Sequence, residues 1–341
     1  MNYISDSNPT YYASNTSNIV IDNNFNSYSV SKGYLYKFDK NNNYITNSEG
    51  LISLGSIYNC CYDSYNNYIY IGTEEGIFQL DANNLSTSSS TAISFFLIPN
   101  SFIIPNMKYI VTDNVGNIYS YSDGYRKFFK FDSYFNLIGV SQIFEQITLL
   151  NIDINNNILF IIGQYAYILN PLLNIVNIFT SPSNFGYYQG CLDNLGNIWL
   201  LCTNNTILKY NILSGDLLLN INFLYNTGCY LIADIYGNIY IYDGNITFYL
   251  YSNNGYLLSI YTVPFILSNN FTAEIIISGI YNNSMKVSTE DANFGLCNLT
   301  ITNNQSDPNI SVSNNSIYSN LNCVPCNNNK KRGAYYGQKR Y

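Results

Sequence analysis

The chain of 341 residues contains no histidine. Without imidazole groups it can form neither a Ser-His-Asp nor a Cys-His catalytic arrangement, and it has no histidine to ligate zinc or copper. A general base would have to be a carboxylate, a lysine, a tyrosine or a cysteine. These absences exclude several large classes of hydrolase, and we identify no catalytic motif elsewhere in the sequence.

Charged residues are scarce as well: they make up 10% of the chain, against about a quarter in ordinary globular proteins. The first 329 residues contain nine basic and all 21 acidic residues, a formal charge of −12. An acidic body argues against nucleic-acid binding, and weak self-repulsion suits a protein that packs against neighbours. The last twelve residues hold no acid and five basic residues: Lys330, Lys331, Arg332, Lys339 and Arg340.

Long apolar runs are missing too. The N-terminus has no basic segment followed by an apolar one, and no stretch of eighteen apolar residues occurs. We therefore expect no secretory signal and no membrane span, and a cytoplasmic or virion-associated protein. Eight cysteines in a chain of this length are too few for a disulfide scaffold.

A ten-residue stretch at 193–202, DNLGNIWLLC, has counterparts throughout the chain. Near-duplicates lie at 113–119 (DNVGNIY) and 234–242 (DIYGNIYIY), and degenerate copies at 63–71 (DSYNNYIYI) and 153–160 (DINNNILF). The aspartate opens a tight turn by capping backbone amides, and the fourth residue must adopt a left-handed conformation. Glycine does so freely and asparagine is the next best residue. The turn aspartates are Asp63, Asp113, Asp153, Asp193 and Asp234, and we expect positive φ at Gly116, Gly196, Gly237, Asn66 and Asn156.

Short apolar strands flank each turn, as at 109–112 and 127–132 around the copy at 113–119. The asparagine that closes the turn marks each copy: Asn18, Asn67, Asn117, Asn157, Asn197 and Asn238, at intervals of 49, 50, 40, 40 and 41. In the first copy we interpret 18–21 as the strand after the turn, with Ser14 in the aspartate position. A faint seventh copy centres on Glu274, with Asn270 in that position.

Four short strands in about forty residues, repeated six or seven times, predict an all-β protein: a β-propeller of six or seven four-stranded antiparallel blades. A β-solenoid is the structural rival, but its coils are usually shorter and lack hairpin turns. We divide the chain into an N-terminal segment (1–13), the propeller (14–302), and an Asn/Ser-rich arm with an irregular basic C-terminal tail (303–341).

The pattern strand–DxxGNIYxx–spacer–xIxxFD–xxG resembles the NHL-type repeat and its relatives among six- and seven-bladed propellers. Residues 107–140 and 230–261 are most similar to it, and the resemblance covers about residues 14–290. It implies the fold strongly. Members of this family include binding platforms for proteins and RNA, and also lactonase-like and lyase-like enzymes. A lactonase-like propeller would hold a divalent cation in its central channel with Glu, Asp and Asn oxygens.

The turn aspartates could in principle form a ring of ligands, but a catalytic group is normally unique, whereas these recur in every copy. We therefore assign them a structural role and predict no metal site, cofactor or catalytic residue. The carboxylates outside the turns do not supply four ligands on inner strands: Glu49, Glu74, Glu75, Glu145, Glu274 and Glu290.

Cysteines offer two candidate sites. Cys61 and Cys191 lie two residues before turn aspartates, and Cys60 is adjacent to Cys61. These thiols would border the central channel, although a small buried core residue is the ordinary role of cysteine. Cys323 and Cys326 form a Cys-x-x-Cys pair without a second pair at zinc-ribbon spacing. For that pair we favour a local disulfide or two free thiols over a metal or redox function.

Together these features favour a non-enzymatic propeller that serves as a structural or protein-docking module in a larger assembly. Its protein partners would contact the propeller surface and the basic tail, which would order on an acidic partner or else remain a solvated end. A composition rich in residues with A/T-rich codons also fits a virion component of a large DNA virus. The alternative is a lactonase-like hydrolase or lyase with a divalent cation in the channel.

Overall fold

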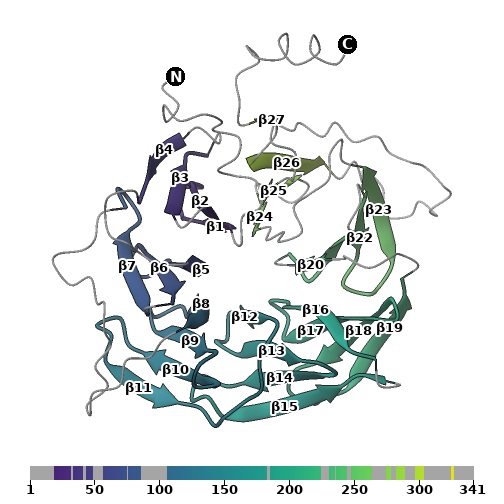
Figure 1. Ribbon diagram of the computed structural model, residues 1–341. Helices are drawn as coiled ribbons and strands as arrows, with labels where there is room; N and C mark the ends of the chain where they lie inside the picture. Colours follow the sequence, from purple (N-terminus) through teal and green to yellow (C-terminus); the bar gives the residue numbers. More distant parts are fainter. Residues whose placement is uncertain are drawn as a thin grey trace, which may run out of the picture.

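The computed structural model describes residues 19–31, 34–40, 44–48, 57–74, 76–85, 106–182, 185–223, 230–234, 236–243, 247–262, 274–277, 282–288, 296–302 and 324–325, with side chains as far as residue 260. All of its regular elements are β-strands. They form seven sheets arranged side by side around a centre, in the order of the sequence (Figure 1).

The strands follow one another in chain order, and each sheet, or blade, is a run of consecutive strands. Blade 1 comprises β1 (Ile19–Ile21), β2 (Ser27–Ser31), β3 (Tyr34–Phe38) and β4 (Tyr44–Asn47). Blade 2 comprises β5 (Ile57–Asp63), β6 (Tyr68–Thr73) and β7 (Ile77–Asp81). Blade 3 comprises β8 (Met107–Thr112), β9 (Ile118–Ser122), β10 (Lys127–Phe131) and β11 (Leu137–Val140). Blade 4 comprises β12 (Leu150–Ile152), β13 (Ile158–Ile162), β14 (Tyr165–Leu169) and β15 (Ile175–Thr180). Blade 5 comprises β16 (Tyr187–Leu192), β17 (Asn197–Cys202), β18 (Thr206–Asn211) and β19 (Leu217–Asn222). Blade 6 comprises β20 (Tyr230–Ala233), β21 (Ile239–Tyr242), β22 (Thr247–Tyr251) and β23 (Leu257–Thr262). Blade 7 comprises β24 (Glu274–Ile277), β25 (Asn282–Ser288), β26 (Leu296–Thr302) and β27 (Val324–Pro325).

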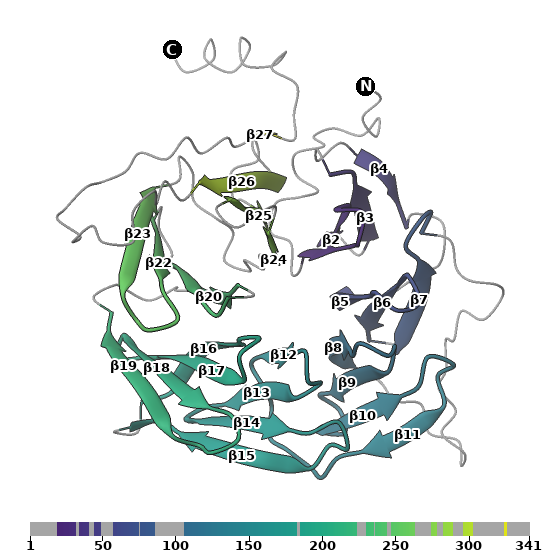
Figure 2. The same ribbon diagram turned by 180° about the vertical axis from the view of Figure 1, so that it is seen from behind.

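Six of the described sheets have four antiparallel strands and the second has three, so the predicted β-propeller fold is confirmed, with seven blades. The residues after β7, 86–105, lie outside the described part of the chain. The first strand of each blade lies nearest the centre and the last lies on the outside (Figures 1 and 2). Each described sheet consists of consecutive strands, and β1 lies against β24 and β25 of the last blade, so the ring closes by packing.

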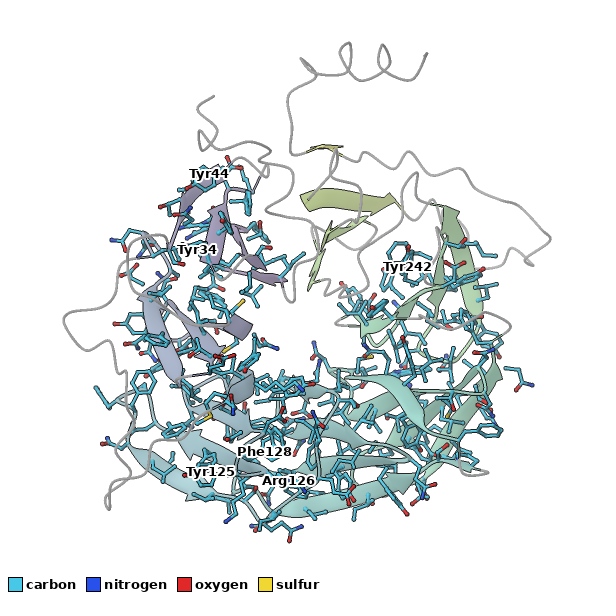
Figure 3. The ribbon with its side chains drawn as sticks, in the orientation of Figure 1. Tyr34, Tyr44, Tyr125, Arg126, Phe128 and Tyr242 are labelled. Atoms are coloured by element: carbon cyan, nitrogen blue, oxygen red, sulfur yellow. The ribbon has the colours of Figure 1, made fainter. Side chains whose placement is uncertain are left out.

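The core lies between neighbouring blades. The second strands of blades 1 to 6 are largely buried on both faces, as in β17, whose six residues are all buried. This explains why these strands are nearly continuous apolar runs, whereas the outer strand β11 alternates between half-buried and exposed positions. Phe128 of blade 3, for example, packs on Phe160 of blade 4, with ring centroids 4.9 Å apart; Phe128 is labelled in Figure 3.

The position predicted for the first repeat is wrong. Asn18 itself lies outside the described residues, and Ile19–Ile21 form the strand before the turn rather than after it. Asp22 opens the turn and Asn26 closes it, with Phe25 in the left-handed position at φ 63°. A bulky residue rarely occupies this region, so the copy has neither Gly nor Asn as a signal. With Asn26 as the marker, the first interval becomes 41 residues.

The last blade also differs from expectation. Residues 274–277 form its first strand, β24, so they precede the turn instead of following it. Residues 298–302 belong to β26, the third strand of this blade. Its neighbour β27 comes from the segment assigned to the arm and tail, through the pairs Cys297–Pro325 and Asn298–Val324. The propeller therefore draws two residues from beyond its predicted boundary at residue 302.

Candidate functional site

Each blade is an antiparallel meander, so its turns lie alternately on two faces of the ring. The turns between first and second strands and those between third and fourth strands share one face, which we call the Asp face. Neighbouring turns on this face contact each other: Asn114 donates its backbone N–H to Asn156 Oδ1 of the next blade, at 3.4 Å. The remaining connections form the opposite face, where Lys108 pairs with Asp123 at 3.2 Å.

The predicted turn aspartates all lie on the Asp face, and each is buried. In blade 3, Asp113 Oδ1 accepts the N–H groups of Val115 (3.1 Å) and Asn117 (2.8 Å). Its Oδ2 accepts the side-chain amide of Asn117 at 2.7 Å. Asp22, Asp153, Asp193 and Asp234 make the corresponding bonds. Their carboxylates therefore point into their own turns rather than toward a common centre.

The fourth turn residue has the left-handed conformation in most copies: φ is 83° at Gly116, 80° at Gly196, 76° at Gly237 and 64° at Asn156. The expectation for Asn66 is wrong. In blade 2, Asp63 pairs with Tyr68, so the turn is one residue longer and the positive φ, 59°, falls on Asn67. Asn66 instead donates its side-chain amide to Asp63 Oδ2 at 2.8 Å.

An aromatic residue six positions after the aspartate extends this turn inward in blades 1, 3 and 5. Its polar atom donates to the second carboxylate oxygen: Tyr28 Oη to Asp22 at 2.8 Å, Tyr119 Oη to Asp113 at 3.1 Å, and Trp199 Nε1 to Asp193 at 3.1 Å. A lysine on the adjacent third strand lies over each ring. The distances from Nζ to the ring centroid are 5.5 Å for Lys37, 5.0 Å for Lys130 and 4.7 Å for Lys209.

These three lysines join their blade to the next one. Lys37 donates to Ala82 O at 2.6 Å, Lys130 to Pro171 O at 3.0 Å, and Lys209 to Asn253 O at 2.9 Å. We call each group of aspartate, aromatic residue and lysine a clasp. Burial lowers the pKa of the three lysines, while the nearby aspartates oppose this shift.

The clasps alternate around the described ring. They connect blade 1 to 2, blade 3 to 4 and blade 5 to 6, whereas the lysine position holds Gln79, Ile168 or Leu250 in the even blades. Sequence reasoning missed the clasps. Their signal is a lysine just before the last aromatic residue of the third strand, in YKFD (36–39), FKFD (129–132) and LKYN (208–211).

The cysteines before the turns belong to the core. Cys60, Cys61 and Cys191 are at most 8% exposed, and burial raises the thiol pKa of Cys61 and of Cys191. A protonated, enclosed thiol is a poor nucleophile and a poor metal ligand. Cys323 and Cys326 lie outside the described residues.

The other candidate residues are dispersed. Glu74 and Glu145 are exposed on the opposite face, and Glu274 lies in β24. Outside the described residues lie three carboxylates and the basic tail: Glu49, Glu75, Glu290, Lys330, Lys331, Arg332, Lys339 and Arg340. In the part that the structure describes, no three His, Cys, Asp or Glu side chains gather as a metal site would require, and no helix is long and apolar enough to cross a membrane.

Exposed apolar side chains gather on two surfaces. The first surface is the Asp face, where ten large apolar side chains stand at turn tips: Phe25, Tyr65, Val115, Ile154, Leu195 and Tyr236 on inner turns, and Tyr134, Leu172, Leu213 and Tyr256 on outer turns. The four on outer turns are the most exposed large hydrophobic residues among the described side chains, at 84, 76, 80 and 71%. Loops are normally polar, so this pattern was a signal that sequence reasoning did not use.

The second surface is the rim, which we define as the outer strands β4, β11, β15, β19 and β23. None of these strands contains a charged residue or a proline. Each pairs with its neighbour through a β-bulge that leaves the second residue of the outer strand without a partner. The bulged residues are all aliphatic: Ile45, Ile138, Val176, Leu218 and Leu258, of which the first four are exposed and Leu258 is half-buried.

Comparisons with known proteins agree with the fold. No family model matches the sequence, and no curated protein matches it either. Among 1511 matching chains of solved structure is the WD40 β-propeller domain of Doa1, with a TM-score of 0.61 and 16% identity. The alignment covers 88% of this chain and 96% of that domain. Similarity at this level of identity establishes that the chain is a β-propeller.

Proposed function

We propose that this propeller is a non-enzymatic docking module, a structural part of a larger assembly that it joins through its rim. One observation carries the proposal: five blades place an aliphatic residue at the same bulge of an outer strand that contains no charge, and four of these residues are exposed. Bulges at sheet edges re-aim side chains, and exposed apolar rows favour contact with another protein.

The composition of the rim supports the same function. Soluble proteins commonly protect an edge strand with lysine, other charges or proline, and the rim has none of these. Ile138, Val176 and Leu218 lie on three consecutive blades and are all exposed. A partner that follows the circumference would bury several of them together, and each buried aliphatic side chain contributes roughly 1.5–3 kcal/mol before ordering costs.

The basic tail forms a second part of this proposal. Lys330, Lys331 and Arg332, with Lys339 and Arg340, would bind an acidic neighbour, because they concentrate five positive charges in a segment without acidic residues. Exposed ion pairs contribute only about 0–1 kcal/mol each, so this contact should weaken with salt. A virion of a large DNA virus is the assembly that we propose, and the turn signature supports kinship with NHL-type repeats.

The rim can be tested with lysine substitutions at the bulges. We define the rim variant as the triple substitution Ile138→Lys, Val176→Lys and Leu218→Lys. It adds one positive charge to the outer strand of each of three consecutive blades. Expressed in the native source, the wild-type chain should sediment in a complex much larger than its 38.8 kDa and be present in purified particles. The rim variant should be lost from that complex while keeping the wild-type melting temperature.

Normal incorporation of the rim variant would contradict docking through the rim. The enzymatic alternative has its own measurement, because a cation held in the channel would stabilise the folded protein by mass action. A melting temperature that rises with calcium and falls with a chelator would support a cation site and argue against a purely structural role.

A further inference from the structure

The Asp face is a second exposed apolar surface, distinct from the rim. Its ten exposed apolar side chains stand at turn tips in two concentric rings, six on inner turns and four on outer turns. On the opposite face, the exposed large apolar residues in described connections are Tyr125, Ile143 and Phe185. Tyr125 and its neighbour Arg126 are labelled in Figure 3. Among the described side chains, exposed apolar turn tips are therefore concentrated on the Asp face.

Few charged side chains are exposed on the described part of the Asp face. The aspartates of the inner turns on the Asp face are buried and bind their own turns, so they do not present carboxylates outward. Among the described side chains, the exposed charged residues of this face are Lys40 and Asp216, whereas Glu74, Arg126 and Glu145 lie on the opposite face. A charged partner would find few groups to pair with here, so the complementary surface must itself be apolar and nearly uncharged.

The area of the apolar tips suits a stable interface. Five of the ten are aromatic, and a fully buried aromatic side chain removes about 150–250 Å² from solvent. With the observed exposed fractions, the tips present on the order of 1,000 Å² of apolar surface. A standard protein interface buries about 800 Å² on each partner.

We propose that the Asp faces of two copies of this chain pack against each other, forming a twofold dimer of stacked rings. The described part of the Asp face has the required properties, since it is broad, apolar and exposes few charged side chains. A twofold axis parallel to the face sets one patch against the same patch on the other copy. The exposed acids Glu74 and Glu145 then point away from the dimer plane, so the acidic bodies repel each other only weakly.

Sedimentation velocity of the full chain from about 1 to 100 µM tests the dimer. The face variant is Tyr134→Lys, Leu172→Lys and Leu213→Lys, which changes three highly exposed tips on blades 3, 4 and 5. The rim variant is its matched control, because it adds the same charge to the same three blades at different positions. The wild-type chain and the rim variant should form dimers, and the face variant should dimerise at least about a hundredfold more weakly with an unchanged melting temperature.

Three results would overturn the proposal. One is a wild-type chain that is monomeric throughout the concentration range, and a second is a face variant that dimerises like the wild type. The third is flotation of a monomeric wild-type chain with phosphatidylcholine vesicles, which would assign the tips to a lipid surface. Incorporation of the rim variant tests docking through the rim, whereas sedimentation tests the dimer. Either proposal can therefore fail while the other holds.

Discussion

Removing the turn aspartate should destabilise a blade with a clasp more than a blade without one. Asp193 in blade 5 and Asp153 in blade 4 open the same kind of turn. Asp193 accepts the N–H groups of Leu195 and Asn197, each at 2.9 Å, and Asp153 makes the equivalent pair of bonds at 2.8 and 2.7 Å. Asp193 also accepts the indole N–H of Trp199 and lies 4.0 Å from Lys209 Nζ. Asp153 has Leu159 in place of the aromatic residue.

The expected magnitudes follow from these contacts. Asp153→Ala removes a cap and should lower the free energy of unfolding by about 1–2 kcal/mol. Asp193→Ala removes the same cap, leaves a buried indole N–H unpaired, and leaves Lys209, whose side chain is 6% exposed, without its carboxylate. Breaking a buried charge pair on one side costs roughly 3–5 kcal/mol, so the loss should be at least twofold larger.

Urea unfolding followed by far-UV circular dichroism measures both losses. Fluorescence offers a second probe, because Trp199 is the single tryptophan and is fully buried. The double variant Asp193→Ala/Lys209→Met should recover part of the loss, since methionine removes the uncompensated charge and keeps most of the volume. Equal losses for Asp153→Ala and Asp193→Ala, or no recovery in the double variant, would refute the clasp as an energetic unit.

Further predictions concern two glycine substitutions, the ionisation of one aspartate and the basic tail. Gly72→Ala should destabilise by about 1–3 kcal/mol in urea unfolding, because the added Cβ would overlap the backbone carbonyl oxygen of Met107. At Gly196 an added Cβ would meet no neighbouring atom, but the backbone φ is 80°. Gly196→Ala should therefore destabilise the protein by about 1–2 kcal/mol through backbone strain. Burial raises the pKa of Asp234, so its contribution to stability is greatest below the usual carboxyl pKa and falls as pH rises through the folded value; urea titrations against Asp234→Asn should show this. Deleting residues 330–341 should leave the melting temperature unchanged and weaken incorporation into the assembly in a salt-dependent way.

The turns were predictable because their chemistry is local. An Asp four residues before an Asn, with Gly or Asn between them, specifies backbone hydrogen bonds and one left-handed residue within five positions. That was sufficient to place the turns at 113–117, 153–157, 193–197 and 234–238. It failed at 22–26, where Phe25 occupies the left-handed position, and was displaced by one residue at 63–67, where the loop is longer.

Contacts between blades were not predictable in the same way. A clasp joins residues more than forty positions apart, as Lys209 and Asn253 do, and a single sequence does not show which turn a lysine reaches. The pairing of β26 with β27 likewise spans the stretch from 303 to 323, whose composition suggested an arm. The rim could be recognised only after the register of the outer pairs showed that Ile138 and Leu218 are bulged.

The bulges also indicate how the rim docks. A bulge interrupts the regular spacing of backbone groups at an edge, so it discourages another strand from pairing there. The same bulge turns Val176 outward, which favours contact through side chains. In the assembly, the amides of β15 should therefore exchange hydrogen faster than those of β14, which are paired on both sides. Hydrogen exchange measured on the complex can decide this, with the rim variant as the undocked reference. If the β15 amides become as slow as those of β14, the partner adds a strand to the sheet, and docking through side chains alone is wrong.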